Sequence, residues 1–412
     1  LEIVIAITTV KGDRLSEIIN LCNSTHCRVR MISDPQAVDE NGNPVAAGFR
    51  ELNTADFLSR DEIQLNNAQI SEYLHDKIVL VTGGGGSIGS ELCRQIMRYQ
   101  PRRLLIFDIY ENCAYELETE LKNKYGPEAP VNTLIGSIRD KARLDDVFDT
   151  YHPSVVFHAA AHKHVPLMEI SPAEAVKNNV FGTKNLLTSA AEHGVERFVQ
   201  LSTDKAVNPT SVMGCTKRIC EMLIQTFAGN TDMKCVAVRF GNVLGSHGSV
   251  IPLFEAQIKK GGPVTLTDPN IERYFMTIPE AAQLVLQAGA LAEGGSIYVL
   301  DMGEPVKIMD LAKQLIRFYG YEPGVNMEIK IVGLRPGEKL YEELMMDEEQ
   351  GKMRRTEHNK IFVASPRDID LAVFYQQLQD LAAAAQHNDE GVVDQLEKMI
   401  PTFTPTRKNL KV

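Results

Sequence analysis

An apolar run that leads directly into a glycine-rich turn constrains this chain more than any other feature. Ile78–Val81 is unbroken in its apolar character, which is typical of a strand buried on both faces of a parallel sheet. It continues into Thr82–Gly89, which reads TGGGGSIG, and a helix is predicted from about Ser90. Glycine permits a tight turn, and the amides of a helix N-terminus bind phosphate. The strand–turn–helix context therefore predicts a dinucleotide site.

Similar apolar runs recur along the chain and predict further strands of the same sheet. They alternate with helical stretches, which indicates an α/β fold with a Rossmann-type, doubly wound parallel sheet. The expected strands are Leu104–Phe107, Val155–His158, Phe198–Leu201 and Val236–Phe240. Beyond about residue 241 the alternation weakens and the loops lengthen, which predicts a smaller substrate lobe.

Three parts are expected from these patterns. Residues 1–76 form a small N-terminal α/β module and linker, and residues 77–350 form the catalytic domain. Within that domain, about 77–240 bind the cofactor and about 241–350 form the substrate lobe. Residues 351–412 form a C-terminal helical tail. Local patterns also predict strands at 2–7 and 29–32, helices at 12–23, 369–386 and 391–399, a loop at 34–48 and a connection at 53–73.

The composition argues against some classes of protein. The 412 residues are 44% hydrophobic and carry a net charge of −11 without a long Lys/Arg run, which disfavours nucleic-acid binding. Seven cysteines lie scattered without a paired spacing, which fits reduced cytoplasmic thiols and predicts no metal site. No apolar run approaches the roughly 18 residues of a membrane span. The chain starts at Leu1 inside a predicted strand, so we expect a fragment of a longer protein.

The turn supplies the expected cofactor contacts. Gly83, Gly86 and Gly89 have the spacing G-x-x-G-x-x-G, and Ser87 and Ile88 open the helix. Asp108 lies 19 residues after Gly89, at the end of the second strand, where a carboxylate accepts hydrogen bonds from the adenosine ribose. Because that carboxylate repels a 2′-phosphate, we expect NAD rather than NADP. A solvated turn residue is the alternative interpretation of Asp108.

A second cluster follows the strand that ends at Leu201. It reads Thr203-Asp204-Lys205, and eight residues later comes Met213-x-x-x-Lys217, whose spacing places both side chains on one helix face. Neighbouring Asp and Lys side chains can supply the acid and the base of an elimination. The alternative is a surface ion pair of little value, and for Met213 a packing residue.

These residues resemble the extended short-chain dehydrogenase/reductase superfamily, and within it the UDP-N-acetylglucosamine 4,6-dehydratases of bacterial polysaccharide and glycoprotein biosynthesis. The resemblance runs from about residue 77 to residue 343. It rests on the segments TGGGGSIGSE, HAAAHKHVPLME, NNVFGTKN, STDKAVNPTSVMGCTKR, RFGNVLGSHGSV and GLRPGEKLYEEL.

The resemblance implies a lyase that converts UDP-N-acetylglucosamine to UDP-2-acetamido-2,6-dideoxy-4-keto-hexose. The sugar is oxidised at C4, water is lost across C5 and C6, and hydride returns to C6. Asp204 is then the acid at C6, Lys205 the base at C5 and Thr203 a hydroxyl partner of the sugar, while Lys217 binds the nicotinamide ribose. Met213 stands where the superfamily has the tyrosine that removes the 4-hydroxyl proton. We infer that Thr203, alone or with Lys217 or a water molecule, relays that proton.

Further roles follow from the same resemblance. Ala159 and Ala160 pass close to NAD, and Ser137 with Ile138 lies near the adenine, with Ser137 replacing the aspartate of relatives. The expected substrate contacts are Lys163, Asn178, Asn242, Arg273, Arg335 and Glu338. The histidines of His158–His164 also suggest a metal cluster, but in the family this loop lines cofactor and sugar, so no metal is expected.

The methionine at position 213 resembles a long, membrane-linked branch of the family. That branch implies retention at C5, a xylo-configured product, and anchoring to the cytoplasmic face of the membrane through helices upstream of residues 1–76. A homo-oligomer is also expected. Alternatives are a UDP-sugar 4-epimerase, a catalytically inactive NAD-binding scaffold or sensor, and a structural partner-binding protein.

Overall fold

The computed structural model describes most of the chain. The described residues are 2–7, 13–23, 25, 27–32, 49–51, 63, 65–346, 349, 353–364, 369–388 and 391–405. The predicted loop at 34–48 and residues 53–62 of the predicted connection lie outside them. The chain divides into two compact units, here called the large unit (64–241, 278–301 and 335–412) and the small unit (1–63, 242–277 and 302–334).

A nine-stranded sheet forms the centre of the large unit, with the order β17-β18-β14-β9-β8-β7-β4-β5-β6. All neighbours from β14 to β6 pair in parallel, whereas β17 and β18 add antiparallel at one edge. The strands are β4 (Ile78–Thr82), β5 (Arg103–Asp108), β6 (Val131–Ile135), β7 (Val155–His158), β8 (Arg197–Leu201), β9 (Lys234–Arg239), β14 (Ile297–Leu300), β17 (Arg354–Arg355) and β18 (Ile361–Ala364).

The chain winds outward from β4 in two directions. It runs through β5 to β6, crosses back to β7 beside β4, and continues through β8 and β9 to β14. The predicted doubly wound α/β fold is therefore confirmed. The order of the strands reverses between β4 and β7, and ligands of such sheets bind at the carboxyl ends of the strands at this point.

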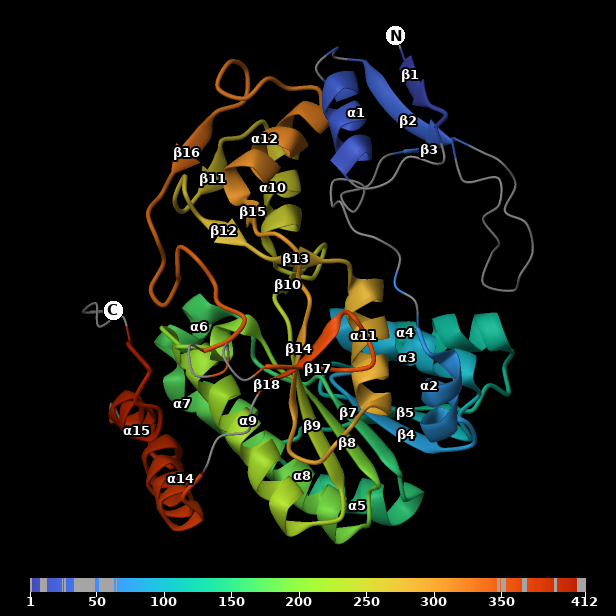
Figure 1. Ribbon diagram of the computed structural model, residues 1–412, viewed down its shortest axis with the longest axis vertical. Coiled ribbons are helices and arrows are strands. Elements are labelled where there is room, and N and C mark those ends of the chain that lie inside the picture. The colour runs from blue at the N-terminus through green and yellow to red at the C-terminus, as the bar shows by residue number, and fades with distance from the viewer. Residues whose placement is uncertain are drawn as a thin grey trace. The chain divides into compact units, whose positions relative to one another are not determined.

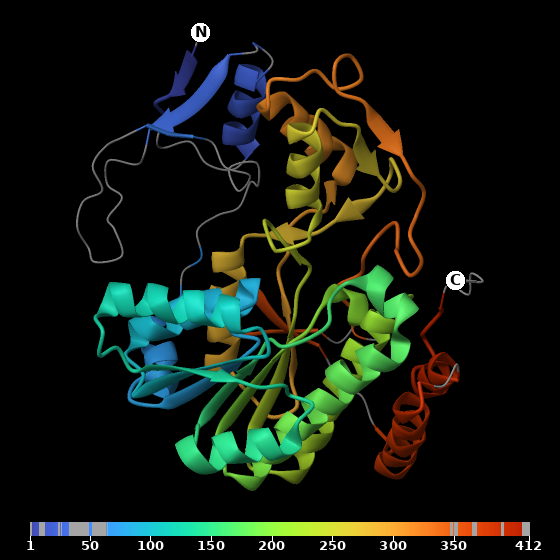
Figure 2. The same cartoon turned by 180° about the vertical axis from the view of Figure 1, so that it is seen from behind.

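Helices cover both faces of this sheet (Figures 1 and 2). One face carries α2 (Asn67–Leu74), α3 (Ser87–Ile96), α4 (Glu111–Tyr125) and α11 (Ile278–Ala290), and the other carries α5 (Lys141–Tyr151), α8 (Gly182–Glu192) and α9 (Val212–Asn230). Shorter elements are η2 (Met97–Tyr99), α6 (Val165–Ile170), α7 (Pro172–Ala175), the π-helical η3 (Val176–Phe181) and η4 (Asp204–Ala206). Phe107, Phe157 and Phe198 are buried completely or nearly so, as strands covered on both faces require.

The C-terminal helices belong to the large unit. They are α14 (Leu371–Gln386) and α15 (Val392–Met399), close to the predicted bounds. Phe374, Leu378 and Leu396 are at most 1% exposed and join the core cluster that contains α9 residues. Burial of these side chains holds the hairpin against α7 and α9.

The small unit contains the N-terminal module together with two later segments. In the module, β1 (Glu2–Ile5), β2 (Arg28–Ile32) and β3 (Phe49–Glu51) form a sheet beside α1 (Asp13–Asn23). Phe318 of α12 packs against the core of this module. The other elements are β10 (Asn242–Val243), α10 (Val250–Lys259), β11 (Val264–Leu266), β12 (Glu272–Arg273), β13 (Phe275–Met276), β15 (Val306–Lys307), α12 (Ile308–Phe318) and β16 (Ile329–Ile331).

The region predicted as a substrate lobe, 241–350, is shared between the units. Its segments 242–277 and 302–334 lie in the small unit, whereas 278–301 and the residues from 335 onward lie in the large unit. The reason is that α11 packs on α3 and β14 adds to the central sheet beside β9. No helix within the described ranges has both the length and the apolar character needed to cross a bilayer.

Candidate active site

The glycine turn after β4 is packed too tightly for any other residue at two positions. Gly83 has φ +68°, and a Cβ there would lie 2.6 Å from the Ala160 nitrogen. A Cβ on Gly89 would lie 2.1 Å from the Gly83 oxygen. Helix α3 starts at Ser87, three residues before the predicted start. Gly86, which precedes it, has an extended backbone. Gly86 brings no side chain to cap the helix, and a helix N-terminus favours an anion.

Backbone hydrogen bonds join the turn to the two neighbouring strands. The Gly83 N–H donates to the Phe107 oxygen at 2.8 Å, and the Ala159 N–H donates to the Thr82 oxygen at 2.9 Å. The Ala159–Ala160 backbone therefore lies directly against the glycine turn, at the reversal point of the sheet.

Asp108 points its carboxylate at the same turn. Its Oδ2 accepts a hydrogen bond from the Gly85 N–H at 2.8 Å, and its Oδ1 accepts one from the Tyr110 N–H at 2.9 Å. The carboxylate therefore lies beside the glycine turn, where an adenosine ribose fits in this class of sheet. The glycine turn, the open helix N-terminus and this carboxylate fit NAD, as the sequence predicts.

The two residues expected near the adenine have local roles. The Ser137 hydroxyl accepts a hydrogen bond from the Arg139 N–H at 3.2 Å. Ile138 is 3% exposed and packs against the position where Gly182 lacks a side chain. Their contacts with adenine stay predictions.

His158 is a neutral structural residue rather than a free ligand. Its ring nitrogens contact the Thr82 hydroxyl at 2.6 Å and the Thr183 hydroxyl at 2.9 Å. Burial, followed by the charge of Lys217, lowers the pKa of His158 to about 3. Both nitrogens are therefore engaged in hydrogen bonds inside the sheet.

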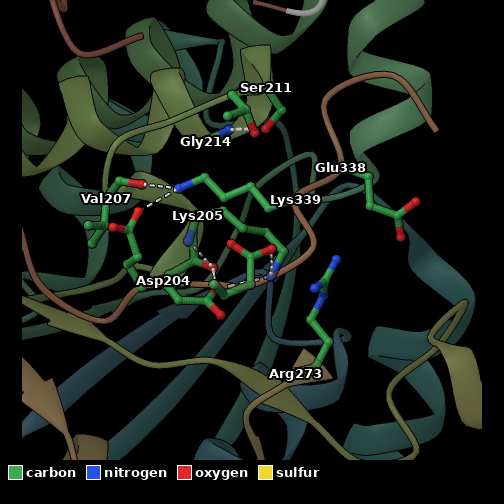
Figure 3. A network of polar contacts seen from close by, with 12 residues as sticks. Asp204, Lys205, Val207, Ser211, Gly214, Arg273, Glu338 and Lys339 are labelled. Carbon is green, nitrogen blue, oxygen red and sulfur yellow. Dashed lines mark hydrogen bonds and ion pairs between the residues drawn. The ribbon is translucent and has the colours of Figure 1, made fainter. Parts of the chain in front are cut away.

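The loop after β8 brings together the predicted catalytic residues Thr203, Asp204 and Lys205, of which Figure 3 labels Asp204 and Lys205. Asp204 is fully buried, and its Oδ1 accepts hydrogen bonds from the Thr203 hydroxyl at 2.8 Å and from the Lys205 Nζ at 3.0 Å. Its Oδ2 has no hydrogen-bond partner among the described residues. A buried carboxylate oxygen without a partner is costly, so this atom fits a role in contact with a ligand.

A buried ionic cluster lies beneath this loop. Glu221 of α9 pairs with Arg239 of β9 at 2.8 Å and with Arg218 at 2.7 Å, and it accepts a hydrogen bond from the Ser202 hydroxyl at 2.7 Å. Arg239 also pairs with Glu349 at 2.8 Å. Burial raises the pKa of Glu221, but the two arginines prevail and lower it to about 2. The cluster fixes the residue that immediately precedes Thr203.

Helix α9 presents both Met213 and Lys217, as the four-residue spacing predicts. The Ser211 hydroxyl caps the helix by accepting from the Gly214 N–H at 3.1 Å. A Cβ on Gly214 would lie 2.2 Å from the Lys205 oxygen, so glycine lets the helix lie against the catalytic loop. Met213 is 5% exposed and belongs to the apolar core. Lys217 is 7% exposed, and burial lowers its pKa.

The remaining predicted substrate residues of the large unit lie on three segments. The Arg335 Nη2 pairs with the Glu338 Oε1 at 3.1 Å, so these two residues contact each other. Lys163 is exposed at its loop, and partial burial lowers the pKa of its amine. Asn178 donates to the side chain of Asn179 at 3.1 Å. Their contacts with a substrate stay predictions.

Asn242 and Arg273 belong to the small unit. Asn242 opens β10, where its N–H donates to the Tyr274 oxygen at 3.0 Å. Arg273 lies on β12, is 7% exposed and donates from Nη1 to the Glu272 oxygen at 2.7 Å. Their contacts with a substrate stay predictions.

Three groups at the site escaped the sequence prediction. Asn179, rather than Asn178, is buried. Its Oδ1 accepts a hydrogen bond from the His162 N–H at 2.8 Å, and its Nδ2 donates one to the His162 oxygen at 3.1 Å. Glu221 organises the buried cluster. Glu342 lies 3.5 Å from the Lys205 Nζ. The available signals in the sequence were the adjacent Asn178 and Asn179 and the glutamates after Gly337. Neither signal shows which residue of a neighbouring pair is buried.

The strand order, the glycine turn and the Asp108 contact define a Rossmann-type dinucleotide-binding protein of the extended short-chain dehydrogenase/reductase class. A family described as polysaccharide biosynthesis protein matches residues 79–366. The chain belongs to this family.

Named relatives include proteins with different activities. The capsular polysaccharide biosynthesis protein CapD of Staphylococcus aureus is 51% identical over 84% of this chain and 57% of the relative. A UDP-N-acetylglucosamine 4,6-dehydratase (inverting) of Campylobacter jejuni is 34% identical over 65% of this chain and 76% of the relative. A UDP-glucose 4-epimerase of Rickettsia canadensis is 32% identical over 82% and 98%. The chain thus spans just over half the length of CapD.

A solved structure shows the same fold. The structure of Pen from Bacillus thuringiensis has a TM-score of 0.66 and 35% identity, covering 71% of this chain and 89% of that one. The family and the Rossmann-type fold predicted from the sequence motifs are confirmed.

Proposed function

We propose that the protein dehydrates UDP-N-acetylglucosamine to the UDP-linked 4-keto-6-deoxy sugar, with retention at C5. The observation that carries this proposal is the buried contact of Asp204 with both Thr203 and Lys205. Elimination needs an acid and a base at adjacent carbons, and this pair offers both from adjacent residues. The dehydratase named among the relatives supports the substrate class.

NAD, when bound, supplies the reversible oxidation at C4 that makes the C5 proton acidic. Lys205 then removes the C5 proton, and Asp204 delivers a proton to the departing C6 oxygen, so that one water leaves. For this step Asp204 must hold a proton, and its complete burial keeps bulk water away from the group. The buried Lys217 would hold the nicotinamide ribose of bound NAD, and Met213 packs in the core.

Thr203 takes the place of a tyrosine hydroxyl in the relay of the 4-hydroxyl proton. Its hydroxyl already donates to the Asp204 Oδ1 at 2.8 Å, which gives the proton a path toward a carboxylate. We expect Thr203→Val to lower kcat about a hundredfold, because valine keeps the shape and loses the hydroxyl. Steady-state kinetics measures this, and Thr203→Ser should retain most activity. Full activity in Thr203→Val would rule out the relay.

An epimerase is the second candidate, because one relative carries that name. Epimerisation at C4 needs no proton transfer at C5 or C6, so it leaves Asp204 and Lys205 without a role. Mass spectrometry of the reaction with UDP-N-acetylglucosamine separates the two: the dehydratase product lacks one water, whereas an epimer has the mass of the substrate. Bound NAD with no turnover would instead indicate an inactive scaffold. The predicted membrane anchoring and homo-oligomer stay predictions.

A further inference from the structure

Two hydrogen bonds join the segment from Gly337 onward to the catalytic loop. Figure 3 shows the one between Lys339 and Val207. The Lys339 Nζ donates to the Val207 oxygen at 3.0 Å, two residues after Lys205. The Thr210 hydroxyl donates to the Gly337 oxygen at 3.0 Å. This segment therefore has a fixed position relative to the loop that carries the proposed acid and base.

A third attachment comes from the buried ionic cluster. Arg239, fully buried on β9, donates from Nη1 to the Leu344 oxygen at 3.0 Å. Glu342 lies between the attachments at Lys339 and Leu344. Its side chain is 3% exposed, and its Oε1 lies 3.5 Å from the Lys205 Nζ.

The Lys205 amine thus contacts two buried carboxyl groups from different parts of the chain. Asp204 contacts it at 3.0 Å from the adjacent residue, and Glu342 contacts it at 3.5 Å from a segment 137 residues away. An ion pair at this depth is screened far less than one at the surface. A carboxylate in a fixed place stabilises a charge that develops during reaction without having to reorganise.

We propose that Glu342 is a positioning residue for the elimination. It aims the Lys205 amine and stabilises the ammonium that forms when Lys205 takes the C5 proton. The inference rests on the proposed dehydratase function. In that step the C5–H bond breaks, the proton moves to Lys205, the electron pair forms the C5–C6 double bond, and the C6 oxygen leaves with the proton of Asp204. Glu342 gains and loses no proton.

The test compares Glu342→Gln with Glu343→Gln, each purified as the full chain with NAD. Glu343 is the matched control, since it belongs to the same segment and its carboxylate lies 3.0 Å from the Lys339 Nζ on the exposed side. With UDP-N-acetylglucosamine we expect Glu342→Gln to lower kcat about tenfold to a hundredfold with KM little changed. In a single turnover, reduced cofactor should accumulate by its NADH absorbance, because oxidation at C4 proceeds while elimination is slowed. Glu343→Gln should match the wild type.

The second variant is Glu342→Asp. It keeps the carboxylate, but the side chain is one methylene shorter, so the carboxylate lies farther from the Lys205 Nζ. We expect kcat between those of the wild type and Glu342→Gln. Wild-type kinetics in Glu342→Gln, or an equal slowing of cofactor reduction and product formation, would overturn the inference while the proposed function stands. Should Glu342→Gln not fold, Glu342→Asp at wild-type kcat would overturn it as well. A wild-type enzyme that forms no 4-keto product would overturn the proposed function, and this inference with it.

Discussion

Asp204→Asn is expected to lower kcat for dehydration about a thousandfold, while NAD binding is unchanged. The amide replaces the carboxyl without a change of size, but it has no acidic proton to deliver to the C6 oxygen. Asp204 is fully buried, so water has poor access to substitute for it. Product formation by NMR measures kcat, and titration with NAD measures binding.

Asp149→Asn is the control for this substitution. Asp149 lies on α5 of the same unit and pairs with His193 at 3.0 Å, with its side chain 73% exposed. We expect it to leave kcat unchanged. If Asp204→Asn kept more than a tenth of the wild-type kcat, Asp204 would not be the acid of the elimination.

Glu221→Gln is expected to reduce the free energy of unfolding by about 3–5 kcal/mol, because it removes the buried carboxylate that Arg218 and Arg239 share. Arg239 keeps its pairing with Glu349. Arg239 is completely buried and Arg218 is 2% exposed, so neither can recover solvation. Urea or thermal unfolding measures the loss. Because the cluster holds Ser202, kcat should also fall.

The exposed pair of Arg94 and Glu120 is the matched control. Its side chains are 35% and 47% exposed, and Glu120→Gln should cost below about 1 kcal/mol. An equal cost for both substitutions would contradict the buried role of Glu221.

The same carboxylate predicts a pH dependence of stability. Its pKa is lower in the folded protein, about 2 against an ordinary 4.5. The unfolded chain therefore binds the proton more readily as the pH falls. The stabilisation from Glu221 is complete above pH 4.5 and is lost between there and about pH 2. Unfolding curves for the wild type and Glu221→Gln should converge across this window, and a constant difference would contradict it.

Sequence patterns were sufficient where a segment is buried on both faces. The runs at β4, β5, β7, β8 and β9 are unbroken or nearly so, and each strand was predicted within two residues. Strand β6 was missed because Asn132 and Thr133 interrupt its apolar character at the edge of the sheet. β14 and β18 were also missed. They join the sheet after the segments 242–277 and 302–334, which belong to the small unit.

In the candidate site, groups that are close together in sequence could be predicted, whereas contacts between distant segments could not. Met213 and Lys217 are four residues apart on one helix, and Thr203, Asp204 and Lys205 are consecutive. In the structure the members of each group lie close to one another. The contact of Glu342 with Lys205 joins residues that are far apart in sequence, so no periodicity predicts it. Arg335 and Glu338 are three residues apart, and their opposite charges pair with each other. Their contacts with a substrate stay predictions.

Dehydration of UDP-N-acetylglucosamine in D2O, followed by NMR, tests the central claim most directly. We predict a 4-keto-6-deoxy product that carries deuterium at C5, because Lys205 exchanges its proton with solvent. The same product made in H2O keeps H5, and nuclear Overhauser effects of H5 should show the retained configuration at C5. A product that keeps its C6 hydroxyl, or no product at all with NAD bound, would contradict the assignment of Asp204 and Lys205 as the acid and base of an elimination.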